Sequence, residues 1–72
     1  MTTVMPHVVN EEYNEQGLLT RIEWSDGKWK KWEYNAQGLC TYWEDSYGFS
    51  ERLKYNKVGE TLCLTSIESH KP

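Results

Sequence analysis

The stretch Tyr13-Asn14-Glu15-Gln16-Gly17-Leu18, YNEQGL, decides the fold because it recurs along the chain. It returns as YNAQGL at 34–39 and, in altered form, as YNKVGE at 55–60. The three tyrosines are 21 residues apart in both intervals, and asparagine and glycine recur with them at the same spacing. A period in this range predicts an array of similar units that stack or meander.

The repeat defines the expected domain organisation. The chain has 72 residues, which is the length of one domain, so we expect a single β-repeat domain over 1–72. Its repeat units are expected at about 13–33, 34–54 and 55–69, followed by a short tail at 70–72.

Each of the first two units carries two turn signals that contain glycine, and the third carries one. One is YNxxG, and the other is Ser25-Asp26-Gly27 or its counterpart Ser46-Tyr47-Gly48. Between the turns lie short runs rich in Thr, Ile, Trp and Tyr, which is the composition of β-strands. Glycine recurs too often for helices. The sequence predicts an all-β fold, an antiparallel β-meander of five or six short strands, near 7–12, 18–24, 28–34, 39–45, 49–55 and 60–67.

The lengths of the turns decide which side chains share a face. We expect a three-residue loop at 25–27, a type I turn closed by glycine, which pairs Trp24 with Lys28. We expect YNxxG to form a four-residue loop such as 35–38 and to reverse the chain three times. One face is then apolar and contains Leu18, Ile22, Trp24, Trp32, Tyr34, Leu39, Trp43, Leu53 and Tyr55.

The opposite face is expected to be mostly charged, with aromatic side chains embedded in it. Its expected members are Arg21, Glu23, Trp29, Lys31, Glu33, Tyr42, Glu44, Phe49 and Glu51. One interpretation is a solvated face with ion pairs between strands. The other is a contact patch for a protein partner, with five candidate binding residues: Arg21, Trp29, Lys31, Tyr42 and Phe49.

The apolar face has no cover within the sequence, because no amphipathic helix is visible. The sheet is therefore expected to twist strongly on itself, to close into a small barrel or to pack against a second copy. We expect a homodimer or a partner-bound form, with a strongly twisted monomer as the alternative.

The composition argues against several classes of function. A net charge of −3 argues against nucleic acid as a partner, and the run 28–32 divides its lysines between two faces. The two histidines and two cysteines lack the spacing of a metal site, so we expect no metal and no cofactor. Free thiols are expected over a disulfide, no apolar run is long enough for a membrane span, and the expected location is the cytoplasm.

The sequence gives no case for an enzyme. The carboxylates are scattered along the strands as surface charges would be, and no paired acid and base can be inferred from them. Cys40 or Cys63 would need a nearby histidine to act as a nucleophile, and His7 and His70 lie in the terminal segments. The glycines are turn residues and form no phosphate-binding loop.

The three motifs YNEQGL, YNAQGL and YNKVGE resemble the YD repeat of RHS and teneurin-type proteins, and the aromatic hairpins look like those of small phage or mobile-element proteins. The resemblance covers residues 12 to about 67, although asparagine replaces the usual aspartate. It implies a β-meander, while enclosure of a cavity needs many more repeats. Choline- and glucan-binding repeats are a competing resemblance, but their Gly-Trp and Tyr-Tyr signatures are missing.

These observations lead to two expected functions. The first is a small non-enzymatic protein-binding module that inhibits or modulates a host protein, a role that the resemblance implies. The second is binding of a carbohydrate or small ligand by aromatic platforms on the sheet.

Overall fold

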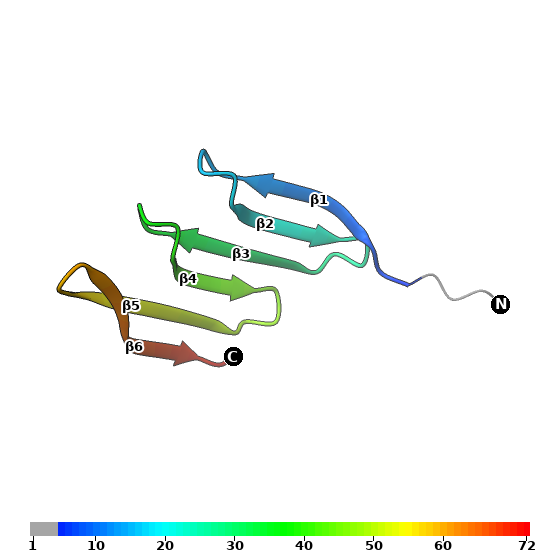
Figure 1. Cartoon of the computed structure of the whole chain (residues 1–72). Coiled ribbons are helices and arrows are strands. Elements are labelled where there is room, and N and C mark those ends of the chain that lie inside the picture. The colour runs from blue at the N-terminus through cyan, green and yellow to red at the C-terminus, as the bar shows by residue number, and fades with distance from the viewer. Residues whose placement is uncertain (1–4) are drawn as a thin grey trace.

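A computed structural model describes residues 5–72, which form one sheet of six antiparallel strands and contain no helix (Figure 1). The predicted all-β meander is confirmed, because the strands lie in the sheet in the order in which they follow in the chain. The strands are β1 (Val8–Tyr13), β2 (Leu19–Trp24), β3 (Trp29–Tyr34), β4 (Cys40–Asp45), β5 (Ser50–Val58) and β6 (Thr61–His70).

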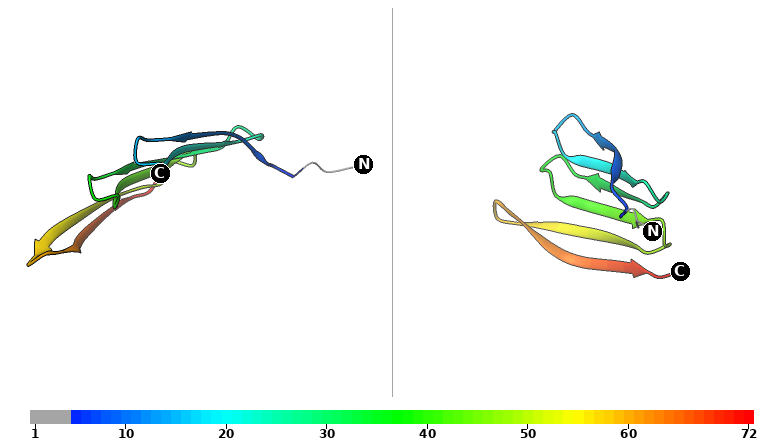
Figure 2. Two further views of the ribbon diagram at one scale, coloured as in Figure 1. Left: turned by 45° about the horizontal axis from the view of Figure 1, so that its top comes forward. Right: turned by 90° about the vertical axis from the view of Figure 1, so that its right-hand side faces the viewer.

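The sheet is a single open layer (Figure 2). Its smallest extent is 14 Å, and its radius of gyration is 15.4 Å. A compact domain of this length would have a radius of gyration of about 11 Å. None of the described side chains is buried as a core residue would be. The sheet twists, but it does not close into the barrel that was one of the expected arrangements.

The Ser-x-Gly turns have the predicted geometry. In the first, the Gly27 amide donates to the Trp24 carbonyl at 3.0 Å, and the Trp24 amide donates to the Lys28 carbonyl at 2.9 Å. Gly27 has φ of 90°, a conformation that glycine adopts without the steric cost of a Cβ. In the second turn, the Gly48 amide likewise donates to the Asp45 carbonyl, and the Asp45 amide donates to the Phe49 carbonyl. Both turns are therefore the expected three-residue loops closed by glycine.

The YNxxG turn is one residue shorter than predicted. The Asn35 amide donates to the Leu39 carbonyl at 2.9 Å, so the loop comprises 36–38 and the expected four-residue loop is wrong. A β-bulge compensates for the difference, because Glu33 pairs with Tyr42 whereas Tyr34 pairs with Cys40. Thr41 is the extra residue, and its hydroxyl donates to the Glu33 carbonyl. A bulge of this kind restores the alternation of faces that the longer loop was expected to provide.

The asparagine side chain explains why this motif makes a turn. In the second copy, Asn35 Oδ1 accepts hydrogen bonds from the amides of Gln37 at 3.1 Å and Leu39 at 2.9 Å. Asn14 makes the same two bonds in the first copy. A short polar side chain that bonds the backbone two residues ahead stabilises a turn locally.

The third copy of the motif does not form this turn. Asn56 and Val58 lie in β5, and the chain reverses instead at Gly59 and Glu60, because Val58 pairs directly with Thr61. Gly59 has φ of 64°, which fits the first central position of a type II′ turn. The expectation that YNxxG reverses the chain three times is therefore wrong. The longer hairpin that results projects away from the other turns (Figure 2).

The lengthened hairpin still keeps the bulge of the other two units. Lys54 pairs with Ser66 and Tyr55 with Leu64, so Thr65 is the extra residue here. Its hydroxyl donates to the Lys54 carbonyl, as that of Thr20 does to the Glu12 carbonyl in the first unit. The strand β6 continues to His70, so the expected tail at 70–72 begins one residue later.

The repeated tyrosine connects each unit to the one before it. Tyr34 donates its hydroxyl to the Leu19 carbonyl at 2.7 Å, and Tyr55 donates to the Cys40 carbonyl at 2.7 Å. Both acceptors occupy the same position of the repeat, 21 residues apart. Tyr13 belongs to the first unit, and its hydroxyl bonds to the exposed Glu11 carboxylate instead. The tyrosine thus has a structural role between units.

Replacing Tyr34 or Tyr55 by phenylalanine is expected to lower the free energy of unfolding by about 1 kcal/mol, the usual contribution of one hydrogen bond. Urea unfolding followed by circular dichroism measures the change. Tyr13→Phe is the matched control and should have little effect, because its hydroxyl bonds only to an exposed carboxylate. Equal losses at all three positions would contradict a role of the hydroxyl between units.

Asn35→Ala is expected to destabilise the fold by about 1 kcal/mol, because it removes two hydrogen bonds that hold a turn. Asn56→Ala changes the same motif position in the third copy, where the residue is part of a strand. It should lower the free energy of unfolding clearly less than Asn35→Ala does. Thermal unfolding of both variants makes the comparison. A larger loss for Asn56→Ala would mean that the third copy also forms the asparagine turn.

Candidate functional site

The strand registers divide the side chains of the sheet into two faces, because directly opposite residues of antiparallel strands lie on the same side. Trp32 pairs with Trp43, and Trp43 pairs with Glu51. We call this side the tryptophan face; it comprises Ile22, Trp24, Lys28, Lys30, Trp32, Tyr34, Trp43, Asp45, Phe49, Glu51, Leu53, Tyr55 and Ile67. The other side is the charged face, which comprises Glu12, Arg21, Glu23, Trp29, Lys31, Glu33, Tyr42, Glu44, Arg52, Lys54 and Glu68.

Phe49 and Glu51 lie on the tryptophan face, so their expected place on the charged face is wrong. The three-residue loop at 46–48 brings Asp45 opposite Phe49 and Trp43 opposite Glu51. The Trp43 indole donates its Nε1–H to Glu51 Oε1 at 2.9 Å, a contact that requires both side chains on one side. The expected loop length was right, and so was the face expected for Leu53 and Tyr55, whereas the face expected for Phe49 and Glu51 did not follow from that loop length.

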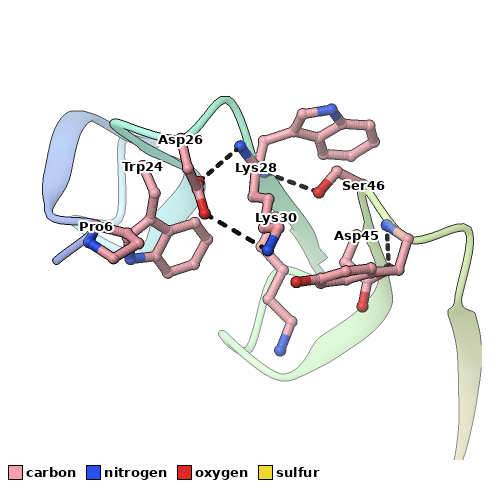
Figure 3. A pocket seen from close by; sticks show the side chains of 9 residues that line it. Pro6, Trp24, Asp26, Lys28, Lys30, Asp45 and Ser46 are labelled. Atoms are coloured by element: carbon pink, nitrogen blue, oxygen red, sulfur yellow. Dashed lines mark hydrogen bonds and ion pairs between the residues drawn. The ribbon is translucent and has the colours of Figure 1, made fainter. Parts of the chain in front are cut away.

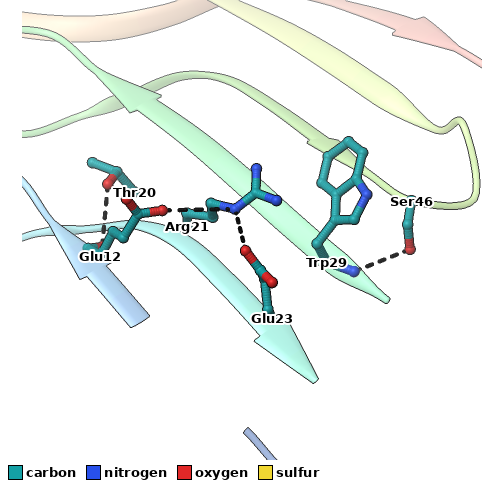
Figure 4. Close-up of polar contacts among 6 residues, drawn as sticks. All are labelled: Glu12, Thr20, Arg21, Glu23, Trp29 and Ser46. Atoms are coloured by element: carbon teal, nitrogen blue, oxygen red, sulfur yellow. Dashed lines mark hydrogen bonds and ion pairs between the residues drawn. The ribbon is translucent and has the colours of Figure 1, made fainter. Parts of the chain in front are cut away.

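Arg21 forms ion pairs on the charged face (Figure 4). The Arg21 Nε lies 2.8 Å from a Glu23 carboxylate oxygen and 3.6 Å from one of Glu12. Arg21 and Lys31 also lie over the Trp29 ring, with 5.4 Å and 5.1 Å to its centroid. These contacts follow the pattern of a solvated face with ion pairs and cation–π contacts between strands.

The structure brings four of the five predicted binding residues together. Arg21, Trp29, Lys31 and Tyr42 share the charged face, whereas Phe49 lies on the tryptophan face. The rings of this group are already in contact with cations of their own chain, since Arg52 lies 4.9 Å from the centroid of Tyr42. A partner would have to displace these cations to reach the rings.

The tryptophan face places aromatic rings at the centre of an uncovered surface. Trp32 and Trp43 are direct neighbours on the two central strands, β3 and β4. The Lys30 ammonium lies over both rings, 4.9 Å from the centroid of Trp43 and 5.8 Å from that of Trp32. Toward the β6 edge, Phe49 is 41% exposed and Ile67 is 50% exposed. The face is therefore open, with aromatic and aliphatic side chains at its centre and the charged side chains of Lys28, Lys30, Asp45 and Glu51 among them.

A shallow cleft of about 370 Å³ lies at the end of the sheet where the two Ser-x-Gly turns meet (Figure 3). Its lining includes Trp24, Asp26, Lys28, Asp45 and Tyr47. The Lys28 ammonium lies 3.5 Å from Asp26 Oδ2 and 5.0 Å from the centroid of the Tyr47 ring. A hydrogen bond to Tyr47, with the charges of Tyr47 and Asp26, raises the pKa of Lys28.

Sequence reasoning missed this cleft. Trp24 and Tyr47 belong to different repeat units, and only the meander brings alternate turns to the same end of the sheet. The order of the turns could have predicted it, because every second turn of a meander lies at the same end of the sheet.

The described residues include two thiols, many carboxylates and a tyrosine with a shifted pKa. Among residues 5–72, no three histidine, cysteine or acidic side chains are grouped as they would be to hold a metal ion. Cys40 is half-buried and Cys63 is exposed, and both thiols are free. Desolvation by burial raises the pKa of Tyr34, whose hydroxyl donates a hydrogen bond to the Leu19 carbonyl.

No helix in the described part of the chain is long and apolar enough to span a membrane.

Comparisons with protein-family models, with curated proteins and with solved structures gave no match to this chain. The resemblance to YD repeats therefore stays an interpretation of the three motifs, and the geometry of the two faces is the basis for a function.

The position of Glu51 can be tested by nuclear magnetic resonance. Glu51→Ala is expected to shift the indole Nε1–H signal of Trp43, because that proton is donated to the carboxylate. Glu44→Ala is the matched control, since Glu44 is a strand neighbour on the charged face. If only the Glu44 variant moved the signal, the assignment of the faces would be wrong.

Proposed function

We propose that this chain is a small, non-enzymatic protein-binding module whose tryptophan face is the contact surface. The observation that carries the proposal is an uncovered face with three tryptophans in a chain where no described side chain is buried. The apolar face of a sheet is normally buried against another layer of secondary structure. A partner that covers this face would supply the missing layer.

The size and chemistry of the face fit a protein better than a small molecule. The face is an open surface, and contact surfaces between proteins are enriched in Trp, Tyr and Phe at their centres. The most important residues of such interfaces are also often tryptophan or tyrosine, surrounded by contacts that exclude water. Trp32 and Trp43 hold this central position here, with Phe49 and Leu53 beside them.

The charged face is a weaker candidate for the same role, because charged side chains surround its two rings, Trp29 and Tyr42, and the centres of protein interfaces are depleted in charged residues. Arg21, Trp29, Lys31 and Tyr42 stay predicted binding residues on that face. Inhibition or modulation of a host protein, which the resemblance to small phage proteins implies, likewise stays a prediction about the partner.

A second candidate function is binding of a carbohydrate in the cleft between the turns. The observation in its favour is the combination of aromatic Trp24 and Tyr47 with the carboxylates of Asp26 and Asp45 in one depression. Aromatic rings beside carboxylate acceptors suit the apolar and hydroxyl surfaces of a sugar. The Lys28 ammonium already lies over Tyr47, so a sugar would have to displace it.

The proposed function predicts that the double variant Trp32→Ser, Trp43→Ser loses the proteins that the wild-type chain retains from a lysate of its source. The matched control is Trp29→Ser, which removes the same side chain from the opposite face of β3. Quantitative mass spectrometry of the retained proteins measures the difference, and circular dichroism checks that both variants keep their strands.

The proposal fails if the Trp29 variant loses those proteins and the double variant keeps them. The carbohydrate candidate gains instead if a glycan quenches tryptophan fluorescence in the wild type and in the double variant but not in Trp24→Ala.

A further inference from the structure

We propose that the protein covering the tryptophan face is a second copy of this chain, and that the two sheets form a sandwich around a two-fold axis. The inference rests on the proposed function, in which the tryptophan face binds protein. It names the partner and predicts which side chains meet.

The area of the face is sufficient for a stable dimer. Six strands at about 4.8 Å spacing and about 20 Å of strand length give about 600 Å² for each face. Two such faces in contact remove about 1,200 Å² from solvent, which exceeds the roughly 1,000 Å² that a specific interface needs. Sheets that pack in this way interdigitate their inner side chains to form the core that a single layer lacks.

The charges on the face select one orientation of the second copy. Lys30 and Asp45 are direct neighbours across β3 and β4, the two central strands. A two-fold axis parallel to the strands and between β3 and β4 places β3 of one copy on β4 of the other. Lys30 of each copy then lies opposite Asp45 of the second copy, and Trp32 lies opposite Trp43. Two pairs of opposite charges and two pairs of rings are formed at once.

The other two-fold axis that joins the same faces is disfavoured. An axis perpendicular to the strands would stack β3 on β3 and β4 on β4. On the tryptophan face, β3 carries Lys30 and no acidic side chain, and Lys28 directly precedes the strand. Lys30 would then be desolvated without an opposite charge across the interface, and an unpaired charge at an interface is costly.

A charge-exchange experiment on the full chain tests this arrangement. In sedimentation experiments over a wide range of concentration, the wild type is expected to dimerise. Lys30→Glu and Asp45→Lys should each weaken the dimer at least tenfold, because each variant opposes like charges. An equimolar mixture of the two should recover most of the lost affinity as a heterodimer, because Glu at 30 then faces Lys at 45, and Asp45 faces Lys30.

The mixture separates contacts between sheets from contacts within a sheet. Each variant keeps two like charges side by side within its own sheet, so pairing inside one copy cannot produce the recovery. Glu33→Ser, on the charged face of β3, is the control and should leave the dissociation constant unchanged. Two folded variants that stay monomeric when mixed would overturn the arrangement, as would a dimer unaffected by either charge change.

Asp45→Lys also removes the oxygen that accepts the amides of Tyr47 and Phe49, so its folding is checked by circular dichroism. If it does not fold, a cycle with Lys30→Gln, Asp45→Asn and the double variant decides. The dissociation constant of the double variant should be no higher than that of the single variant with the weaker dimer, because both changes remove the same contact between Lys30 and Asp45. Additive losses would contradict the pairing.

The two proposals fail differently. A wild type that stays monomeric at every concentration, with protein capture that still depends on Trp32 and Trp43, excludes the second copy and leaves the binding function intact. A dimer and a protein capture that both survive the loss of Trp32 and Trp43 contradict the role of the tryptophan face itself.

Discussion

A single layer of β-sheet cannot bury a side chain between its own elements, and this constraint governs the molecule. Its stabilising contacts within one copy run between neighbouring strands, and the repeat supplies the same ones again and again. The asparagine turn, the bulged threonine and the tyrosine hydroxyl bonded to the preceding unit each occur at least twice in equivalent positions. These polar contacts set the register, and the register sets the composition of both faces. The apolar face remains without a layer to cover it.

The strands could be predicted closely from the sequence because glycines mark their ends. The expected strand at 39–45, for example, differs from β4 by one residue. The bulges could not be predicted, since a threonine in a strand looks the same whether or not it is paired. YNKVGE was misleading because it keeps the tyrosine, asparagine and glycine of the turn, yet Asn56 and Val58 extend the strand.

The candidate site was predictable only in part, for two different reasons. The face on which Phe49 lies follows from the three-residue loop at 46–48, which was predicted correctly. Alternating the side chains from that loop would have placed Phe49 on the tryptophan face. The cation–π contacts of Arg21 and Lys31 with Trp29 depend on side-chain conformations that a sequence does not reveal. They explain how an aromatic ring among charged side chains can belong to a solvated face here.

The most direct test of the account is an isotope-filtered nuclear Overhauser experiment on a mixture of labelled and unlabelled chains. A covered tryptophan face predicts contacts between the Trp32 ring of one copy and the Trp43 ring of the other. Contacts between copies that involve only the edge strands β1 and β6 would contradict the account, and so would the absence of any contact between copies in a sample that sediments as a dimer.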